Sequence, residues 1–299
     1  MDMLTDVHHH AIPDFYADAM RKEGMEEIDG FPIPEWSVDR TLALMESAGI
    51  GFAILSVSAP GVSFLHGSRA RGLAMQCNDF LSSLQRQYPD KLGFFATVPL
   101  DDSLEAVQEA ERALDTLGAQ GVCLLTNHRG SYPGDDRFWP LYGMLNAHKA
   151  RVFLHPTRPV QERTIGLRPP ILDYPIDTTY AVAHLLTAGV LEKFSGIEWI
   201  LSHCGGAIPF LSKRLILGDA NLGKDLAKAQ RSAELMQQLR FDTALAFDPA
   251  ILRLTASASK YDLSFGSDFP FISDEMILRE AKTYTELTKN AQPAKTDGA

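Results

Sequence analysis

The chain has 299 residues, 45% of them hydrophobic and 22% charged, which is enough to bury a large core. Its formal net charge of -10 disfavours nucleic acid and anionic membrane surfaces as partners, and no apolar run is long enough to predict a membrane span. The cysteines, Cys77, Cys123 and Cys204, are too few and too scattered for a disulfide framework, which together with the absence of a signal-peptide pattern predicts a cytoplasmic protein.

Short apolar runs recur along the chain, and each is followed by a segment with helical spacing. Several runs lack strict alternation, as expected for parallel strands covered on both faces. They predict eight strands, at residues 3–8, 51–58, 92–99, 121–127, 151–156, 198–204, 239–245 and 261–270. Eight repeats of strand then helix predict an α/β fold, a single (β/α)8 TIM-barrel domain over residues 1–290, with its active site at the carboxyl ends of the strands. An open doubly wound sheet is the alternative, but the Gly-rich phosphate loop expected after its first strand is missing.

Two connecting segments carry clear helix signals. The first has a Ser cap at Ser37 and ends in Gly49, and the second starts at Ser103 and ends in Gly118. The long Pro-rich segment at 157–176 has no regular period, which is typical of a functional lid. Residues 291–299 are expected to form a disordered tail.

Polar side chains lie at the predicted ends of four strands. In "LTDVHHHAIPD", at residues 4–14, His8 and His10 share one face of a strand, and the histidine between them points to the other face. His155 ends the fifth strand, His203 the sixth and Asp268 the eighth. Imidazole and carboxylate groups converging on one rim predict a site for zinc or a similar divalent ion. The remaining histidines are expected on the surface or in packing, namely His66, His128, His148 and His184.

With these residues the chain resembles the amidohydrolase superfamily, which has His-X-His on strand 1, His on strands 5 and 6, and Asp on strand 8. The segments "DVHHHAIPDFY", "GVCLLTNHRGSY", "LSHCGGAIPFLSKR" and "FGSDFPF" are similar to the branch of aminocarboxymuconate-semialdehyde and salicylate-type decarboxylases. The segment "ILSVSAPGVSF" is similar to 6-methylsalicylate decarboxylases. The resemblance, which runs from about residue 4 to 272, implies a metal-dependent decarboxylase of an ortho-hydroxylated aromatic acid that releases CO₂ and a phenol.

The resemblance also implies roles within the cluster. His8, His10, His155 and Asp268 would bind one divalent metal ion, with His203 nearby as an unliganded acid or base. Two-metal members of the superfamily need a bridging carboxylated Lys or a Glu, and "GVCLLTN" offers neither, so one metal is expected. Three nitrogens and one oxygen suit zinc, while related decarboxylases also use manganese. No organic cofactor is expected.

The substrate contacts are also expectations. Arg214 lies where the resemblance implies a partner for the substrate carboxylate, in its own active site or in that of a neighbouring subunit, because relatives of this branch generally form dimers. A homodimer or homotetramer is therefore expected. Arg163 and Arg168, in the segment at 157–176, are the alternative anion binders. The aromatic residues that are candidates to stack on the substrate ring are Trp36, Phe64 and Phe271. The arginine that the family places before the "EW" tryptophan is missing here, which favours a substrate with fewer carboxylates.

Decarboxylation needs a proton on the ring carbon before CO₂ leaves, since an aryl anion is too unstable. Asp268 or His203 is expected to deliver this proton, and the sequence does not choose between them. The alternative enzyme is a lactonase-like hydrolase, in which a metal-bound water attacks the carbonyl and Asp268 takes its proton. A catalytically inactive metal-binding or interaction protein is the third possibility. It is disfavoured because the sequence supplies a residue for each chemical role in catalysis. Release of CO₂ would identify the decarboxylase, and ring opening of a lactone would identify the hydrolase.

Overall fold

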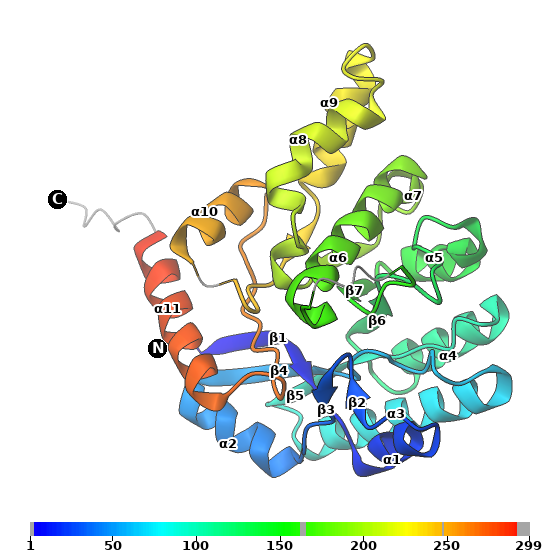
Figure 1. The fold of residues 1–299 in the computed structure, drawn as a ribbon, viewed down its shortest axis with the longest axis vertical. Helices are drawn as coiled ribbons and strands as arrows, with labels where there is room; N and C mark the ends of the chain where they lie inside the picture. Colours follow the sequence, from blue (N-terminus) through cyan, green and yellow to red (C-terminus); the bar gives the residue numbers. More distant parts are fainter. Residues whose placement is uncertain (1–2, 162–165, 247, 292–299) are drawn as a thin grey trace.

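The protein is described here by a computed structural model that covers residues 3–161, 166–246 and 248–291 (Figure 1). Its strands are β1 (Leu4–His10), β2 (Glu27–Ile28), β3 (Phe31–Pro32), β4 (Ile50–Ser56), β5 (Leu92–Ala96), β6 (Gly121–Leu125), β7 (Arg151–His155), β8 (Glu198–Leu201) and β9 (Arg240–Phe241). Its α-helices are α1 (Asp14–Lys22), α2 (Val38–Ala48), α3 (Gly67–Gln87), α4 (Ser103–Asp115), α5 (Trp139–Ala147), α6 (Pro169–Thr187), α7 (Val190–Lys193), α8 (Ile208–Asp219), α9 (Leu226–Met236), α10 (Pro249–Ser257) and α11 (Asp274–Ala291).

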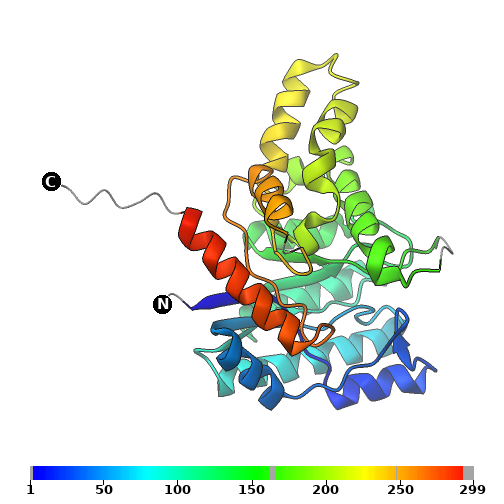
Figure 2. The same ribbon diagram turned by 60° about the vertical axis from the view of Figure 1, so that its left-hand side comes forward.

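A parallel sheet of seven strands forms the centre of the fold. Its order is β1-β4-β5-β6-β7-β8-β9, so strands that follow one another around the sheet also follow one another along the chain. Parallel neighbours need crossover connections, and the helices that supply them lie around the outside of the curled sheet (Figures 1 and 2). The expected α/β class with a mostly parallel sheet is confirmed, and seven of the predicted strands form at or near their expected positions.

The eighth predicted strand, at 261–270, is wrong as a continuous strand. Its residues make isolated parallel bridges instead. The bridges are Asp6–Phe265, His9–Phe269 and Asp242–Ser264. The pleat is interrupted because Asp268 has a left-handed φ of 54° and because Gly266 lies so close to β1 that a Cβ would come within 2.9 Å of the His8 Cβ. The segment therefore pairs with both edges of the sheet without forming a regular strand.

The caps of two helices agree with the sequence signals. The Ser37 hydroxyl accepts a hydrogen bond from the backbone N–H of Arg40 at the start of α2, and Gly49 ends that helix with a φ of 70°. Helix α4 begins at Ser103 as expected, although its capping side chain is the preceding Asp102. Short-range signals were sufficient here because a cap is a local hydrogen bond.

A small apolar cluster fills the inside of the curled sheet. Its buried members are Val7, Ile54, Phe95, Cys123, Phe153 and Ile200, each from a different strand of the sheet. The Phe95 and Phe153 rings stack with centroids 5.5 Å apart, and the Phe153 ring meets the edge of the His8 ring at 5.0 Å. Two larger clusters pack the outer helices against the sheet. The inner cluster thus supports the histidines from within the sheet. All three cysteines are free and buried.

The Pro-rich segment at 157–176 is only partly irregular. Helix α6 begins at Pro169, with proline in its first turn, where the fixed φ and the missing N–H do no harm. The expectation of an irregular segment is therefore wrong from Pro169 onward. Arg163 lies outside the described residues, and so does the tail from residue 292.

Helices α8 and α9 form a hairpin that projects from the rest of the molecule (Figures 1 and 2). Several large apolar side chains on this hairpin and its turn are exposed, namely Phe210, Leu217, Leu222 and Leu226. None of the described helices combines the length and the apolar content needed to cross a bilayer.

Candidate metal and active site

Four histidines and one aspartate meet at the carboxyl end of the sheet. The Nε2 atoms of His8 and His10, at the end of β1, lie 3.0 Å apart. Asp268 places Oδ1 3.2 Å from His8 Nε2 and 3.3 Å from His10 Nε2. His155, the last residue of β7, and His203, just after β8, complete the group, with ring centroids 5.0 and 4.8 Å from that of His8. The five residues predicted to share one rim are therefore together.

Each of the four rings is held through its Nδ1 atom, which leaves Nε2 free to face the centre. His8 Nδ1 lies 2.8 Å from Asp242 Oδ2, and His10 Nδ1 lies 3.1 Å from Ser56 Oγ. His155 Nδ1 donates to the carbonyl of Pro156 at 2.7 Å, and His203 Nδ1 donates to that of Ala244 at 3.2 Å. A hydrogen bond on the second ring nitrogen is how proteins orient histidines that bind metals.

The chemistry of this donor set fits a divalent cation. The candidate ligand atoms of His8, His155, His203 and Asp268 all lie within 4.8 Å of one another. His10 belongs to the same group through its close contacts with His8 and Asp268. Nitrogen and carboxylate oxygen atoms at this spacing can supply the ligands of zinc or manganese.

His9 follows the period of the strand and points away from the cluster. Its Nδ1 lies 2.9 Å from Asp6 Oδ2, its Nε2 lies 3.2 Å from the Thr41 hydroxyl, and its ring packs on Phe269. It is fully buried, so these partners satisfy both ring nitrogens in the layer between sheet and helices. The predicted division of the three histidines between two faces is confirmed.

Burial and charge act on the cluster in opposite directions. Burial lowers the pKa of His8, but the carboxylates of Asp242 and Asp268 outweigh burial and raise this pKa to about 10. Burial lowers the pKa of His10 to about 4 and, with the neighbouring imidazoles, holds the pKa of His155 well below its usual value. Burial would raise the pKa of Asp268, yet the adjacent histidines hold it well below its usual range. His10 and His155 are therefore neutral beside an ionised carboxylate, which is the protonation state that binds a cation, whereas His8 would release a proton when a cation binds.

A cavity of about 330 Å³ opens above this cluster. His155, His203 and Asp268 are part of its lining, and Phe271 connects it to His10, whose ring it meets edge-on at 5.6 Å. The rest of its wall is mainly apolar and includes Ile28, Phe31, Pro170, Ile171, Tyr174, Leu245 and Ile272. A largely apolar wall with a few convergent polar groups is typical of a site for a small aromatic ligand.

Two residues that sequence reasoning missed are important here. Asp242 binds His8 and also accepts hydrogen bonds from the backbone N–H groups of His203 and Ala244, at 2.8 and 3.0 Å. It lies in the middle of the seventh predicted strand, at 239–245, whereas the structure ends β9 at Phe241 and so places Asp242 at the carboxyl end of that strand. Tyr174 lines the cavity from α6 and donates to the carboxylate of Asp29 in the turn between β2 and β3. No local pattern pointed to Tyr174, because the two segments meet only in the folded chain.

Of the other residues predicted to contact the substrate, some line the cavity and some do not. Phe271 lines the cavity, whereas Trp36 packs near Phe80 and Phe64 near Tyr16, and neither is part of the lining. Arg214 is exposed on α8 and is not part of the lining.

Arg168 precedes α6 and lies with its guanidinium carbon 4.5 Å from the centre of the Phe31 ring. It therefore packs on the outer side of a cavity-wall residue.

The remaining histidines interact outside the cluster. His66 and His128 contact Asp101, His148 contacts Asp115, and His184 accepts a hydrogen bond from the N–H of Gly134. None of the four lines the cavity above the cluster within the part of the chain that the structure describes. The expectation of surface and packing roles is in agreement with these contacts.

Comparison with known proteins identifies the family of this chain. Residues 5–296 match the amidohydrolase family, and the chain belongs to it. The chain is 36% identical over 300 residues to the 6-methylsalicylic acid decarboxylase of Penicillium expansum, covering 95% of this chain and 91% of that protein. It is also 36% identical over 290 residues to the decarboxylase yanB of Aspergillus niger, covering 91% of this chain and 78% of the relative.

Solved structures share the fold. A crystal structure of an amidohydrolase II superposes with a TM-score of 0.87 at 32% identity, covering 92% of this chain and 90% of that one. The 5-carboxyvanillate decarboxylase of Novosphingobium aromaticivorans, solved with manganese and 4-hydroxy-3-methoxy-5-nitrobenzoic acid, has a TM-score of 0.78 at 20% identity. The superposition covers 94% of this chain and 88% of the carboxyvanillate decarboxylase.

Proposed function

We propose that the protein is a metal-dependent, non-oxidative decarboxylase of an ortho-hydroxylated aromatic acid resembling 6-methylsalicylate, with CO₂ and a phenol as products. The observation that carries the proposal is a cluster of four inward-facing imidazoles and one carboxylate beneath an apolar cavity. The relatives named as 6-methylsalicylic acid decarboxylase and decarboxylase yanB support the reaction and the substrate class.

In this proposal His8, His10, His155 and Asp268 hold one divalent ion, and no organic cofactor takes part. The short distances among His8, His10 and Asp268 support this ligand set. His203 lies near enough to be the alternative histidine ligand. Zinc suits the nitrogen-rich donors, and manganese is present in a structural neighbour. When bound, the ion supplies positive charge that stabilises a phenolate and a carboxylate on adjacent ring carbons.

The residues of the chain then orient the substrate and move one proton. The apolar wall, with Phe31 and Phe271 among its members, packs against the ring and excludes water. The proton that the substrate hydroxyl loses on binding passes to Asp268 or His203, which then delivers it to the ring carbon that bears the carboxylate. The C–C bond then breaks, its electron pair restores the aromatic ring, and CO₂ leaves.

The fold in this proposal is a complete (β/α)8 barrel in one domain, with the metal at the carboxyl ends of the strands. The bridges that join residues 264–269 to both edges of the sheet support this description. The described part of the segment at 157–176 contributes to a lid over the site, since Pro170, Ile171 and Tyr174 line the cavity.

The functional unit is a homodimer or homotetramer in the cytoplasm. The exposed apolar side chains of the α8–α9 hairpin support an interface there, since large exposed apolar patches mark interaction surfaces. Arg214 lies on the same hairpin and would contact the substrate carboxylate of a neighbouring subunit. Three free, buried cysteines are in keeping with a reducing compartment.

Turnover of a panel of salicylates tests the proposal. The metal-loaded enzyme should release CO₂ and the matching phenol from 6-methylsalicylate but not from the isomer whose hydroxyl is para to the carboxylate. The same enzyme should not open a panel of lactones. Lactone opening without CO₂ release would instead establish the hydrolase, and a protein that binds metal but converts neither panel would refute both enzymatic assignments.

A further inference from the structure

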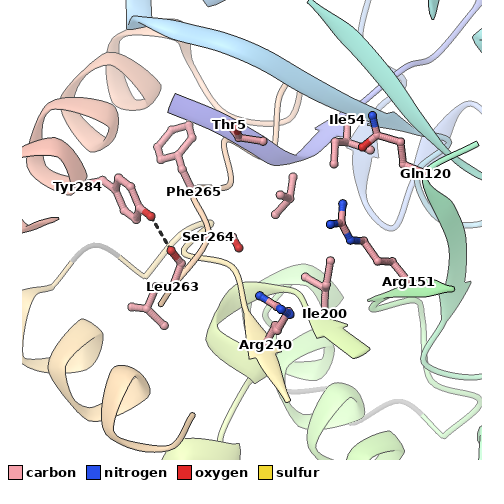
Figure 3. Close-up of a pocket in the computed structure, with 11 residues that line it drawn as sticks. Thr5, Ile54, Gln120, Arg151, Ile200, Arg240, Leu263, Ser264, Phe265 and Tyr284 are labelled. Carbon is pink, nitrogen blue, oxygen red and sulfur yellow. Dashed lines mark hydrogen bonds between the residues drawn. The ribbon is translucent and has the colours of Figure 1, made fainter. Parts of the chain in front are cut away.

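A second cavity, of about 320 Å³, lies at the opposite end of the sheet, where the strands begin (Figure 3). Its lining comes mainly from the first residues of strands and from the chain just before them. The lining residues on which the inference depends are Gln120, Arg151, Ile200, Arg240, Ser264 and Phe265. None of these belongs to the histidine cluster, so the proposed reaction does not account for this cavity.

Two arginines provide its positive charge. Figure 3 shows the guanidinium groups of Arg151, from the start of β7, and Arg240, from the start of β9, facing the interior of the cavity. Both are close to a single carboxylate, that of Glu198, with Arg151 Nε 3.4 Å from Oε2 and an Arg240 terminal nitrogen 3.6 Å from Oε1. Two positive charges that share one negative charge leave a net positive site in a chain whose formal net charge is -10.

The hydrogen-bond donors of these side chains are largely unused. Within the described residues, the two guanidinium groups make one hydrogen bond, from Arg151 Nε to Glu198, and Arg240 Nε is buried without a partner. Arg240 is held in place by stacking on Tyr261, with its guanidinium carbon 3.7 Å from the ring centre. A planar donor group that is held in place in this way is suited to bind a carboxylate through two hydrogen bonds.

The inner side of the cavity is apolar. Ile200 and two other lining residues, Val7 and Ile54, belong to the inner cluster of the sheet, and Phe265 is buried beside them. The same cluster contains Phe153, whose ring touches His8 on its other side. The inner cluster therefore separates the two cavities and offers the second one a hydrophobic floor.

We propose that this cavity binds a small organic carboxylate with an apolar body, of the size of benzoate. The carboxylate lies between Arg151 and Arg240, with the amide of Gln120 and the hydroxyl of Ser264 within the same lining, and the apolar body lies on Ile200 and its neighbours. The arginines at the mouth disfavour neutral aromatic molecules, which lack a negative charge. The apolar floor disfavours inorganic anions, which have no apolar body.

Equilibrium dialysis of the full chain against radiolabelled benzoate tests this inference by counting molecules bound per chain. The wild type should bind one benzoate more than the double variant Arg151→Gln/Arg240→Gln, whatever number binds above the histidines. Failure of the decarboxylase proposal therefore leaves this difference unchanged. Each lost arginine contact should weaken binding roughly tenfold or more.

Ser264→Glu is the second variant, in case the double variant does not fold. It keeps both arginines and places a carboxylate beside them, so it should also lose one benzoate. Arg231→Gln is the matched control, because Arg231 is exposed on α9 and pairs with Glu192 and Glu234. Equal benzoate counts in the wild type and the folded variants would overturn the proposal. Acetate or inorganic phosphate competing as well as benzoic acid itself would overturn the role of the apolar floor.

Discussion

His203 is held by its backbone in a way that the other histidines of the cluster are not. Its φ of 51° is left-handed, and its N–H donates to Asp242 Oδ1 at 2.8 Å. Such a conformation is uncommon for a residue with a side chain and is typical of functional sites. The position of its ring therefore depends on a turn and a carboxylate rather than on the pleat of a strand.

We expect His203→Ala to keep the metal and the fold but to lose turnover by about a hundredfold to ten-thousandfold, because positioned acid–base groups contribute that much. Elemental analysis and steady-state kinetics on the same preparation measure the two effects. Loss of the metal would make His203 a ligand instead, and turnover within a few-fold of the wild type would exclude a catalytic role. His148→Ala, at a histidine far from the cavity lining, is the control.

Glu280 provides a pH dependence that is separate from catalysis. It is only 5% exposed on α11, its Oε2 has no hydrogen-bond partner among the described residues, and burial, with a smaller effect of Asp268, raises its pKa to about 8. Between about pH 4.5 and 8 the folded state therefore holds a proton that the unfolded state has released. In that window the contribution of Glu280 to the free energy of unfolding falls as pH rises.

Glu280→Gln removes this ionisation. The variant should gain on the order of 1–3 kcal/mol over the wild type at pH 8.5 in urea unfolding, and much less at about pH 4.5. Glu275→Gln, at an exposed site on the same helix, should change little at either pH. An equal gain for Glu280→Gln at both pH values would show that its charge is not responsible.

The cluster could be predicted from the sequence because its residues follow apolar runs. The carboxyl ends of parallel strands meet, so the positions of His155, His203 and Asp268 followed from the strand pattern alone. Aromatic residues carry no such positional signal. Trp36 and Phe64 pack near other aromatic rings, while Tyr174 lines the cavity and contacts Asp29, far away in the sequence.

At the scale of elements, the turn after β8 depends on a close approach to α6. A Cβ on Gly206 would lie 2.0 Å from the backbone oxygen of Pro175, and this glycine has a φ of 62° and a ψ of -122°. No residue with a side chain fits without moving α6, which forms a wall of the cavity. A shift of the turn at Gly206 would therefore also shift α6 and, with it, the cavity wall.

Gly206→Ala should cost at least about 2 kcal/mol of stability and lower turnover, because strain at the turn displaces both His203 and α6. Gly72→Ala is the matched control, since a Cβ there meets nothing within 4 Å in the middle of α3. That control should be stabilising by roughly 0.5–1 kcal/mol through the better helix propensity of alanine. Thermal unfolding and kinetics separate the two variants, and similar behaviour of both would contradict this account of the turn.

The elements that could be predicted are those with local signals. Continuous apolar runs gave the main strands, and capping residues gave α2 and α4. The short β2–β3 pair has little local signal, and the interruption after Gly266 arises from its close approach to His8, which only the folded chain contains. The start of α6 was missed because several prolines hide its helical period, although proline is favoured in a first turn.

At the scale of the whole molecule, the proposed interface on the α8–α9 hairpin would make activity depend on assembly. Arg214→Ala should raise the Michaelis constant or cut turnover, by roughly tenfold if one charge-assisted hydrogen bond to substrate is lost, while metal content stays full. Arg231→Ala, on the other helix of the hairpin, should leave the kinetics unchanged.

Light scattering of Leu222→Asp tests the same surface, because Leu222 is 81% exposed at the turn of the hairpin. This variant should dissociate into smaller species. It should also lose activity, as the separate variant Arg214→Ala does. A Leu222→Asp protein of unchanged mass would place the interface elsewhere. Unchanged kinetics for Arg214→Ala, Arg163→Ala and Arg168→Ala would leave the metal as the sole anchor of the carboxylate.

The pairing of β1 with residues 264–269 also has a consequence for the order of events during synthesis. The Ser267 hydroxyl donates to the His8 carbonyl across 259 positions of sequence, and the Asp268 N–H donates to the same carbonyl. A growing chain on the ribosome thus displays its first histidines long before their carboxylate partner has been made. Closing so long a loop is an entropic cost met late in folding. In the proposed function, an ion would meet its complete set of ligands only after Asp268 has been made and has folded back onto β1.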